Sequence, residues 1–309
     1  GEKRMAVIGI DLHSNCFSIC IIEEDGTKWK KEFNLDAESL SQFYKLLGPE
    51  TSVLVEASTN TFKFSDLIRD KVKRVYVANT HKLKLISMVK KKTDKIDAEK
   101  LAIFLKMQIS SGEELIKPVY IPEKIIQDLR AIFTTYNMFK KQIGQIKNRI
   151  HSLLKQNLFP FTREYIFGRN GREKIKGIEL EEAPRYQIEI LFQELDYMEG
   201  KMVEVDEKIR LMGAPYYRDI NILASMKGIS VVTAIAIIAD VGTVARFQNS
   251  KHFTSYLRSA PGIDSSNETQ RVTRTNKFGR KLSVVLVSQA LNHFRDSNKK
   301  LGRWCEKKI

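Results

Sequence analysis

The first eighty residues consist of short apolar runs separated by polar breaks, which is the pattern of a sheet. The run 6–11 is rich in β-branched residues and ends in Asp11, so it predicts a buried central strand. Runs at 17–22 and 29–33 follow across short turns and predict an antiparallel three-strand meander. The pattern then predicts a helix over 40–47, a strand over 52–55 that leads to Glu56, a helix over 62–70 and a strand over 75–77. This order is that of a ribonuclease-H-like α/β sheet.

From residue 123 onward the apolar positions recur at alternating steps of three and four, which is a heptad pattern. It predicts one long helix with a seam at Ile125, Leu129, Ile132, Tyr136, Phe139, Ile143, Ile146, Ile150 and Leu153. After a Gly- and Arg-containing stretch at 167–177, Pro184 can open a second helix. Its seam is Ile188, Leu191, Leu195, Met198, Met202, Val205, Ile209 and Met212. The two helices predict a coiled-coil hairpin or two arms paired between subunits, and two amphipathic helices packed on a globular domain remain the alternative.

The third part of the chain begins after the boundary marked by Gly213, Ala214 and Pro215. Residues 222–238 have the form of a helix, a tight turn containing Lys227 and Gly228, and a second helix of small residues. This helix-hairpin-helix pattern can hold a DNA phosphate, although a single glycine between two helices is common and does not establish DNA contact alone. We therefore expect three domains, at 5–118, 119–214 and 215–309, of which the last is mainly helical.

The charge balance indicates a polyanionic partner. The chain has 52 Lys plus Arg against 37 Asp plus Glu, a net charge of +15 and a pI near 9.6. Such an excess supports salt-sensitive binding to DNA or RNA, and it also fits a ribosomal or membrane-surface protein. No apolar run approaches the roughly 18 to 20 residues that span a bilayer, so we expect a cytoplasmic protein without a membrane partner. The three cysteines have no metal-site spacing, which favours a structural role.

Four carboxylates have the spacing that a metal site needs. Asp11 and Glu56 end predicted strands, and Asp94 and Asp97 stand three residues apart at a helix start, where both can share one face. Clustered carboxylate oxygens bind hard cations, so we expect Mg²⁺, with two ions about 4 Å apart and Mn²⁺ as a substitute. Taken singly, each residue fits an ordinary strand end or helix N-terminus. A lysine-rich flank precedes the pair and predicts either a phosphate contact or a solvated face: Lys82, Lys84, Lys90, Lys91, Lys92 and Lys95.

Several blocks of the chain resemble one family of mobile-element enzymes. The blocks are Ile8-Gly9-Ile10-Asp11, Val55-Glu56-Ala57-Ser58, Lys92-Thr93-Asp94-Lys95-Ile96-Asp97-Ala98-Glu99-Lys100-Leu101-Ala102, Met226-Lys227-Gly228-Ile229 and Tyr256-Leu257-Arg258-Ser259-Ala260-Pro261. Together they resemble the DEDD insertion-sequence transposases of the "IS one-ten" class, which are relatives of the Piv-type DNA invertases. The resemblance implies a RuvC-like N-terminal domain, a coiled-coil middle and a C-terminal transposase domain.

The resemblance also implies a serine nucleophile. In the family that serine follows the proline block by five residues and precedes a glycine, and here the position is Ser266. Asn267 stands where the glycine is usual; asparagine tolerates a left-handed backbone better than most residues, and Ser265 remains a substitute. A polar loop with two hydroxyls is the structural alternative. A second basic stretch follows and is expected to grip the DNA backbone: Arg271, Arg274, Lys277, Arg280 and Lys281.

Proteins of this kind are guided by a structured RNA that pairs with donor and target DNA, so the resemblance implies a guide RNA beside double-stranded DNA. We expect a metal-dependent recombinase that forms a covalent DNA-protein link, works as a homodimer or tetramer, and assembles its site within one chain or between two. Two rivals remain. A RuvC-like Holliday-junction nuclease would use metal-activated water in place of Ser266, and a non-enzymatic nucleic-acid-binding protein would bind without strand chemistry.

Overall fold

The computed structural model describes residues 6–79, 98–116, 118–257, 262–266, 269–273 and 298–307. The chain forms two compact units, residues 1–121 and 122–309, and each is described by itself. The expected boundary after residue 118 lies close to this division. Within the described residues, no helix is both long and apolar enough to cross a membrane.

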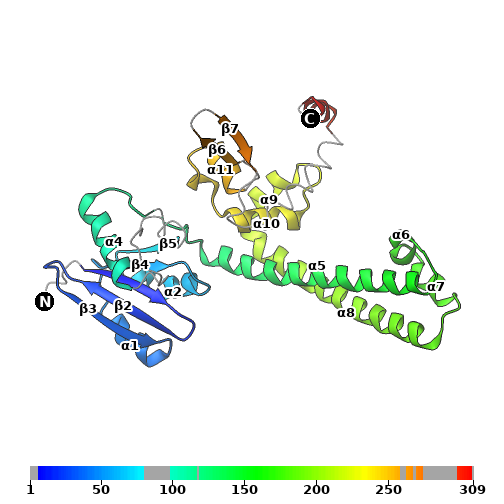
Figure 1. Ribbon diagram of the computed structural model, residues 1–309, viewed down its shortest axis with the longest axis horizontal. Helices are drawn as coiled ribbons and strands as arrows, with labels where there is room; N and C mark the ends of the chain where they lie inside the picture. Colours follow the sequence, from blue (N-terminus) through cyan, green and yellow to red (C-terminus); the bar gives the residue numbers. More distant parts are fainter. Residues whose placement is uncertain are drawn as a thin grey trace. The chain divides into compact units, whose positions relative to one another are not determined.

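The first unit is built on a five-stranded mixed sheet in the order β3-β2-β1-β4-β5 (Figure 1). The strands are β1 (Val7–Leu12), β2 (Cys16–Ile22), β3 (Lys28–Asn34), β4 (Ser52–Glu56) and β5 (Arg74–Ala78). The first three form an antiparallel meander, and β4 and β5 run parallel to β1. The predicted order of strands and helices along the chain and the antiparallel meander are therefore confirmed, and the arrangement fits a ribonuclease-H-like domain.

Helices cover both faces of this sheet, because alternate residues of each strand point to opposite sides. On one face, Ile8, Ile10 and Phe17 pack with residues of α1 (Ala37–Tyr44) and α2 (Thr61–Ile68). On the other face, Val7 and Leu54 pack against α4 (Ala98–Ser111). A 3-10 turn, η1 (Arg69–Lys71), follows α2 and leads toward β5. The result is a three-layer unit with two apolar cores.

The second unit begins with two long helices that pack side by side, α5 (Lys124–Gln156) and α8 (Glu182–Gly213) (Figure 1). Short helices α6 (Arg163–Phe167) and α7 (Gly171–Lys176) connect them. Toward this connection the two helices share a core that contains Ile150 and Leu195. The heptad positions thus pack within one chain, as expected for a hairpin, and the coiled-coil geometry itself remains a proposal.

The other end of the hairpin merges with shorter helices. Ile126 of α5 and Ile209 of α8 pack with Ile235 of α10 (Val231–Val241). The remaining described elements are η2 (Ala214–Tyr216), α9 (Tyr217–Ala224), η3 (Val244–Arg246), α11 (Ser250–Tyr256), β6 (Gly262–Ser266), β7 (Thr269–Thr273) and α13 (Lys299–Glu306). The helical character of the C-terminal region is confirmed, whereas the β6-β7 hairpin was not part of the expectation. The predicted boundary at 214 cuts through this shared core and remains a prediction.

Candidate functional site

Asp11 and Glu56 end neighbouring parallel strands on the same face of the sheet. The register of β1 and β4 runs from Val7 opposite Ser52 to Ile10 opposite Val55, and the two acids directly follow that last pair. Strand alternation gives them the face of Val7 and Leu54, which is the face that α4 covers. Asp11 keeps 17% of its side chain exposed. The first two expected ligands are therefore neighbours at one rim of the sheet.

Hydrogen bonds fix the loops around these two acids. Thr61 Oγ1 donates to the Glu56 carbonyl oxygen at 2.7 Å and holds the end of β4 to the start of α2. Asn60 Nδ2 donates to the His13 carbonyl oxygen at 3.1 Å, which joins the loops that follow β4 and β1. His13 Nε2 lies 3.2 Å from Asp11 Oδ2. Sequence reasoning missed His13 as a site residue, and its position two residues after Asp11 was the available signal.

Helix α4 begins over the same strand face. A Cβ atom at Gly9 would lie 2.1 Å from the Ala98 carbonyl oxygen and 2.3 Å from the Ala102 nitrogen, so only glycine permits this approach. From there the helix runs toward the opposite rim, where Ile109 and Val7 line a common hollow. The chain therefore enters α4 from the side on which Asp11 lies.

An ion-pair network ties the first turn of α4 to the edge of the sheet. Glu99 accepts from Lys30 Nζ at 2.7 Å and from Lys28 Nζ at 3.3 Å, and both lysines belong to the edge strand β3. The hydrogen bond from Lys30, followed by that from Lys28, lowers the pKa of Glu99 below its usual value. Glu99 therefore stays ionised and the bridge persists at neutral pH.

The other half of the expected carboxylate set lies outside the described residues. Asp94 and Asp97 fall there, as do Lys90, Lys91 and Lys92. Within the part of the chain that the structure describes, no three His, Cys, Asp or Glu residues group in the manner of a metal site. The described contribution is thus the pair Asp11 and Glu56, whose carboxylate oxygens are ligands that hard cations prefer.

Cys16 lies near this pair without the properties of a nucleophile. Burial, a hydrogen bond to Glu32 and the negative charges of Glu32 and Asp11 raise the pKa of the Cys16 thiol. A thiol with a raised pKa remains protonated at neutral pH, and the protonated form is a poor nucleophile. The structural role expected for Cys16 is consistent with this environment.

The candidate serine lies in the β6-β7 hairpin of the second unit. Ser266 is the last residue of β6 and pairs with Thr269, so only Asn267 and Glu268 join the two strands. Arg271 lies on β7 opposite Asp264. The other expected cations of this region lie outside the described residues: Arg274, Lys277 and Arg280.

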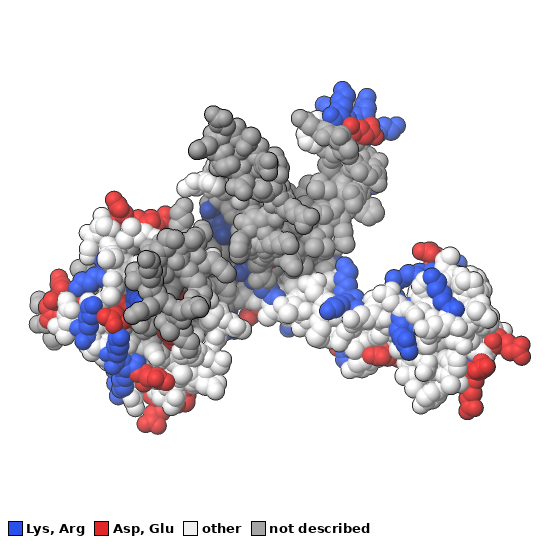
Figure 2. Space-filling model, viewed as in Figure 1, with Lys and Arg blue, Asp and Glu red and all other residues white. Residues whose placement is uncertain are grey.

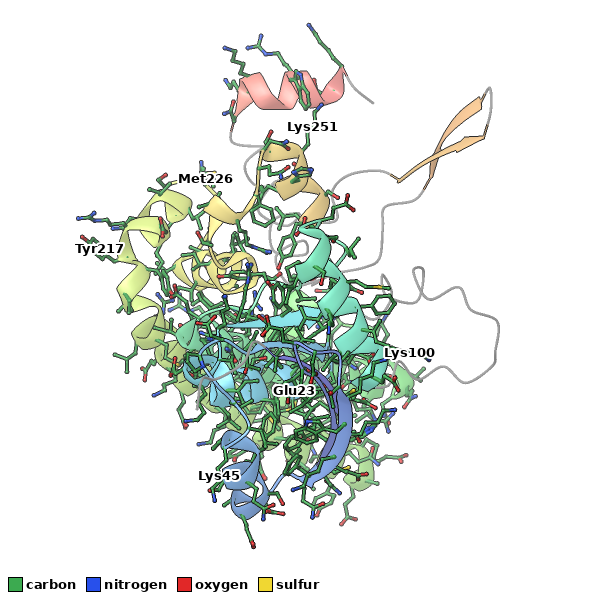
Figure 3. All side chains as sticks on the ribbon, turned by 90° about the vertical axis from the view of Figure 1, so that its left-hand side faces the viewer. Glu23, Lys45, Lys100, Tyr217, Met226 and Lys251 are labelled. Atoms are coloured by element: carbon green, nitrogen blue, oxygen red, sulfur yellow. The ribbon has the colours of Figure 1, made fainter. Side chains whose placement is uncertain are left out.

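Lys227 lies in the turn between α9 and α10. The residue is exposed, and Gly228 beside it has φ +97°, a backbone conformation that favours glycine. Ser230 caps α10 by accepting from the Thr233 nitrogen at 3.2 Å. Figure 3 shows Met226 at the outer side of this turn, where it is 39% exposed. Two helices thus flank a glycine-containing turn as the sequence predicted, whereas the helix-hairpin-helix motif and its contact with DNA remain proposals.

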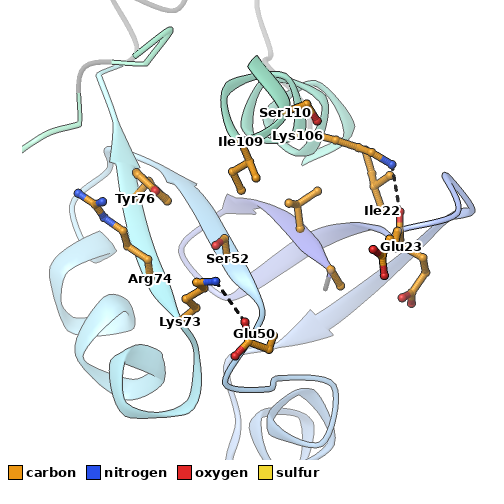
Figure 4. A pocket seen from close by; sticks show the side chains of 13 residues that line it. Ile22, Glu23, Glu50, Ser52, Lys73, Arg74, Tyr76, Lys106, Ile109 and Ser110 are labelled. Atoms are coloured by element: carbon orange, nitrogen blue, oxygen red, sulfur yellow. Dashed lines mark hydrogen bonds and ion pairs between the residues drawn. The ribbon is translucent and has the colours of Figure 1, made fainter. Parts of the chain in front are cut away.

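A hollow of about 430 Å³ lies at the opposite rim of the sheet from Asp11 (Figure 4). Both lysines that line it already have partners in the protein. Lys73 pairs with Glu50 at 3.1 Å, and Lys106 Nζ donates to the Glu23 carbonyl oxygen at 3.0 Å. Neither Asp11 nor Glu56 lines it. The hollow is therefore separate from the rim at which Asp11 and Glu56 lie.

Two family models match the sequence. The model described as "Transposase", of the DEDD type named for IS110, matches residues 8–160. The model described as "Transposase IS116/IS110/IS902 family" matches residues 220–302. The first span contains Asp11, Glu56, Asp94 and Asp97, and the second contains Ser266. No curated protein matches the chain.

Proposed function

The chain belongs to the IS110 family of DEDD transposases, and from that premise we propose how it cuts and rejoins DNA. Enzymes of this type use a divalent metal. We propose that this metal is Mg²⁺, for which Mn²⁺ can substitute, and that Asp11, Glu56, Asp94 and Asp97 bind it. We propose Ser266 as the nucleophile. A structured guide RNA would choose the DNA sites, so that base pairing rather than the protein reads the sequence.

The observation that carries this proposal is the pairing of Asp11 and Glu56 at one rim of the sheet. Val7 to Ile10 register with Ser52 to Val55, so the two carboxylates follow in register on one face. Helix α4 starts over Gly9 on that same face, and Asp97 is the residue before its first residue, Ala98. We therefore propose that Asp94 and Asp97 complete a four-carboxylate site with Asp11 and Glu56.

These residues fit a hard cation. Carboxylate oxygens are the preferred ligands of Mg²⁺, and a partly exposed pair at a sheet rim leaves room for phosphate oxygens. A bound divalent ion would neutralise negative charge on the phosphate and stabilise attacking and leaving oxygens. The protein's own part is positional: Thr61 holds the end of β4 through the Glu56 carbonyl, and Asn60 joins the neighbouring loops.

The proposed chemical step is a phosphoryl transfer to serine. The Ser266 hydroxyl gives up its proton, its oxygen bonds to the phosphorus, and one phosphorus–oxygen bond of the DNA backbone breaks. The departing oxygen takes a proton and leaves as a hydroxyl, so one phosphoester replaces another and no external energy source is needed. Ser265 and Ser266 are consecutive residues of β6, so the experiment must distinguish between the two hydroxyls.

The first experiment tests the carboxylates. Asp11→Asn and Glu56→Gln should each remove cleavage of labelled DNA that bears the element's ends, while RNA binding stays near normal. Asp94→Asn and Asp97→Asn should behave alike. Matched variants of exposed acids on α8, Glu189→Gln and Glu194→Gln, serve as controls because these residues belong to the other compact unit. Full activity of the Asp11 variant, or of the wild type in EDTA, contradicts the metal site.

The second experiment tests the serine. Ser266→Ala should abolish the covalent DNA-protein adduct on a denaturing gel, and peptide mapping of the wild-type adduct should identify Ser266. Ser265→Ala is the matched control and should retain the adduct. An adduct through Ser265 moves the nucleophile by one residue. Free DNA ends without an adduct would instead support a junction nuclease that uses metal-activated water.

Assembly as a homodimer or tetramer is part of the proposal. The heptad residues Ile150 and Leu195 are buried inside the hairpin, so they are not available to a second subunit. We therefore propose that subunits contact one another through exposed aromatic residues of α8. Tyr186 and Tyr197 are 63% and 62% exposed there. A Tyr186→Lys, Tyr197→Lys variant should lower the mass measured by light scattering. An unchanged oligomeric mass places the interface elsewhere.

A further inference from the structure

The two long helices of the hairpin carry opposite charge. Helix α5 has seven Lys or Arg and one Asp, whereas α8 has eight Asp or Glu and four Lys or Arg. No acidic residue occurs between Asp128 and Glu164. Figure 2 shows basic side chains on the side of the hairpin where α5 and α6 lie and acidic ones toward the start of α8. One helix of the hairpin is thus positively charged and the other is negatively charged.

Four of the five cations on the outer half of α5 lack acidic partners within the described residues, whereas Lys147 pairs with Glu199 at 2.7 Å. Lys140, Lys141, Arg149 and Lys155 are all exposed and form no ion pair there. Two of the four basic residues of α8 differ, because they pair with carboxylates of their own helix. Lys201 pairs with Glu204 and Arg210 pairs with Asp206, both at 2.7 Å. The uncompensated charge of the hairpin therefore lies on α5.

The spacing of these cations suits an extended phosphate backbone. From Lys140 to Lys155 the helix rises about 22 Å at 1.5 Å per residue, which matches six to seven base pairs of duplex at roughly 3.4 Å each. Arg163 adds a further cation to this surface, because its guanidinium donates to Asn148 Oδ1 on the exposed side of α5 at 2.7 Å. Ile146 and Ile150 pack inward, so the cations are free to face solvent.

The α5 part of this surface lacks the aromatic rings on which unpaired bases stack. Between Lys140 and Gln156 the helix has no Phe, Tyr or Trp. Single-stranded nucleic acid is held chiefly by stacking on aromatic rings, whereas duplexes are held through their phosphates. We infer that the α5 face formed by Lys140, Lys141, Arg149, Lys155 and Arg163 binds the phosphate backbone of duplex DNA.

The test is a salt titration of DNA binding by the full-length protein. Fluorescence anisotropy with a labelled duplex of unrelated sequence, in EDTA, measures Kd across a range of KCl concentrations. Each phosphate contact contributes about 0.9 to the slope of log affinity against log salt. The variant Lys140→Gln, Lys141→Gln, Lys155→Gln should therefore lower the slope by about 2 to 3 and weaken binding at least tenfold.

A matched variant separates the surface from total charge. Lys201→Gln, Lys208→Gln, Arg210→Gln removes three positive charges from α8 and should leave the slope nearly unchanged. Equal losses in the two variants would overturn the inference, because general electrostatics would then account for both. A loss confined to duplex RNA of the same sequence would also overturn it. The assay needs neither metal nor Ser266, so its result is independent of the cleavage mechanism.

Discussion

Replacing Gly9 with alanine should disable strand cleavage by displacing α4. The added Cβ would lie 2.1 Å from the Ala98 carbonyl oxygen and 2.3 Å from the Ala102 nitrogen. Both neighbours are backbone atoms, so rotation of a side chain cannot relieve the contact. Gly9 lies on a central strand with β2 on one side and β4 on the other, so β1 is held in place too. The helix must therefore move away from the sheet.

The size of this movement follows from the contacts. Ordinary contacts begin near 3.4 Å, so the first turn of α4 must move by more than an ångström. Overpacking of this kind costs typically about 1 to 3 kcal/mol of unfolding free energy, and a backbone contact belongs at the upper end. A misplacement of about 1 Å near reacting groups lowers the rate of chemistry by about 100-fold. Because Asp97 precedes Ala98 directly, we expect that loss in the cleavage step.

The assay compares single-turnover cleavage by Gly9→Ala and wild type over a range of Mg²⁺ concentrations, together with urea unfolding. The variant should cleave about 100-fold more slowly at saturating Mg²⁺ and need more Mg²⁺ to reach half its maximal rate. Gly200→Ala on α8 is the control, since a Cβ atom added there would meet nothing within 4 Å. That change should stabilise the helix by up to about 1 kcal/mol. Wild-type cleavage by Gly9→Ala at unchanged stability would refute the reasoning.

Three further predictions concern stability. Asp11→Asn should abolish the stabilisation of the fold by Mg²⁺ in thermal melts, because it removes a carboxylate of the proposed metal site. Arg130→Met should lower the unfolding free energy by about 3 kcal/mol in urea, since the buried guanidinium donates to two carbonyl oxygens at the end of α10. The hydrogen bond from Arg172 lowers the pKa of Asp196, and this exposed pair should stabilise the fold by under about 1 kcal/mol. That contribution should be complete at pH 7 and be lost as the pH falls below about 4. Asp196→Asn should therefore lower the free energy of unfolding at pH 7 and leave it unchanged at low pH.

The strands and long helices were predictable because they leave local marks on the sequence. Val7 to Ile10 is a β-branched run that could only be buried, and the three-four spacing of Ile143, Ile146 and Ile150 marks one face of a helix. The end-of-strand carboxylates Asp11 and Glu56 followed from the same patterns. Their adjacency required the further assumption that β1 and β4 pair, and the register confirms it.

The remaining features depend on contacts between distant segments, which no local pattern encodes. In the sequence Gly9 is only a residue that weakens a strand, and its role becomes clear only from the close approach of α4. The ion pair between Glu99 and Lys28 joins residues that are seventy-one positions apart. The heptad seam could not decide between pairing within a chain and pairing between chains. The β6-β7 hairpin escaped notice because its segments are short and polar. Only the packed structure distinguishes these alternatives.

The location of these unpredicted contacts bears on how the enzyme is controlled. Asp11 and Glu56 belong to strands of the sheet, whereas Asp94 and Asp97 precede α4. The position of α4 on the sheet depends on Gly9 and on the ion pair between Glu99 and Lys30. Ser266 belongs to the other compact unit. If the proposed metal site needs both acidic pairs and the proposed nucleophile Ser266 comes from a separate unit, strand cleavage would have to wait until all three parts meet. Assembly on nucleic acid would supply that condition, and it would prevent the carboxylates and Mg²⁺ from cutting DNA before the partners are in place.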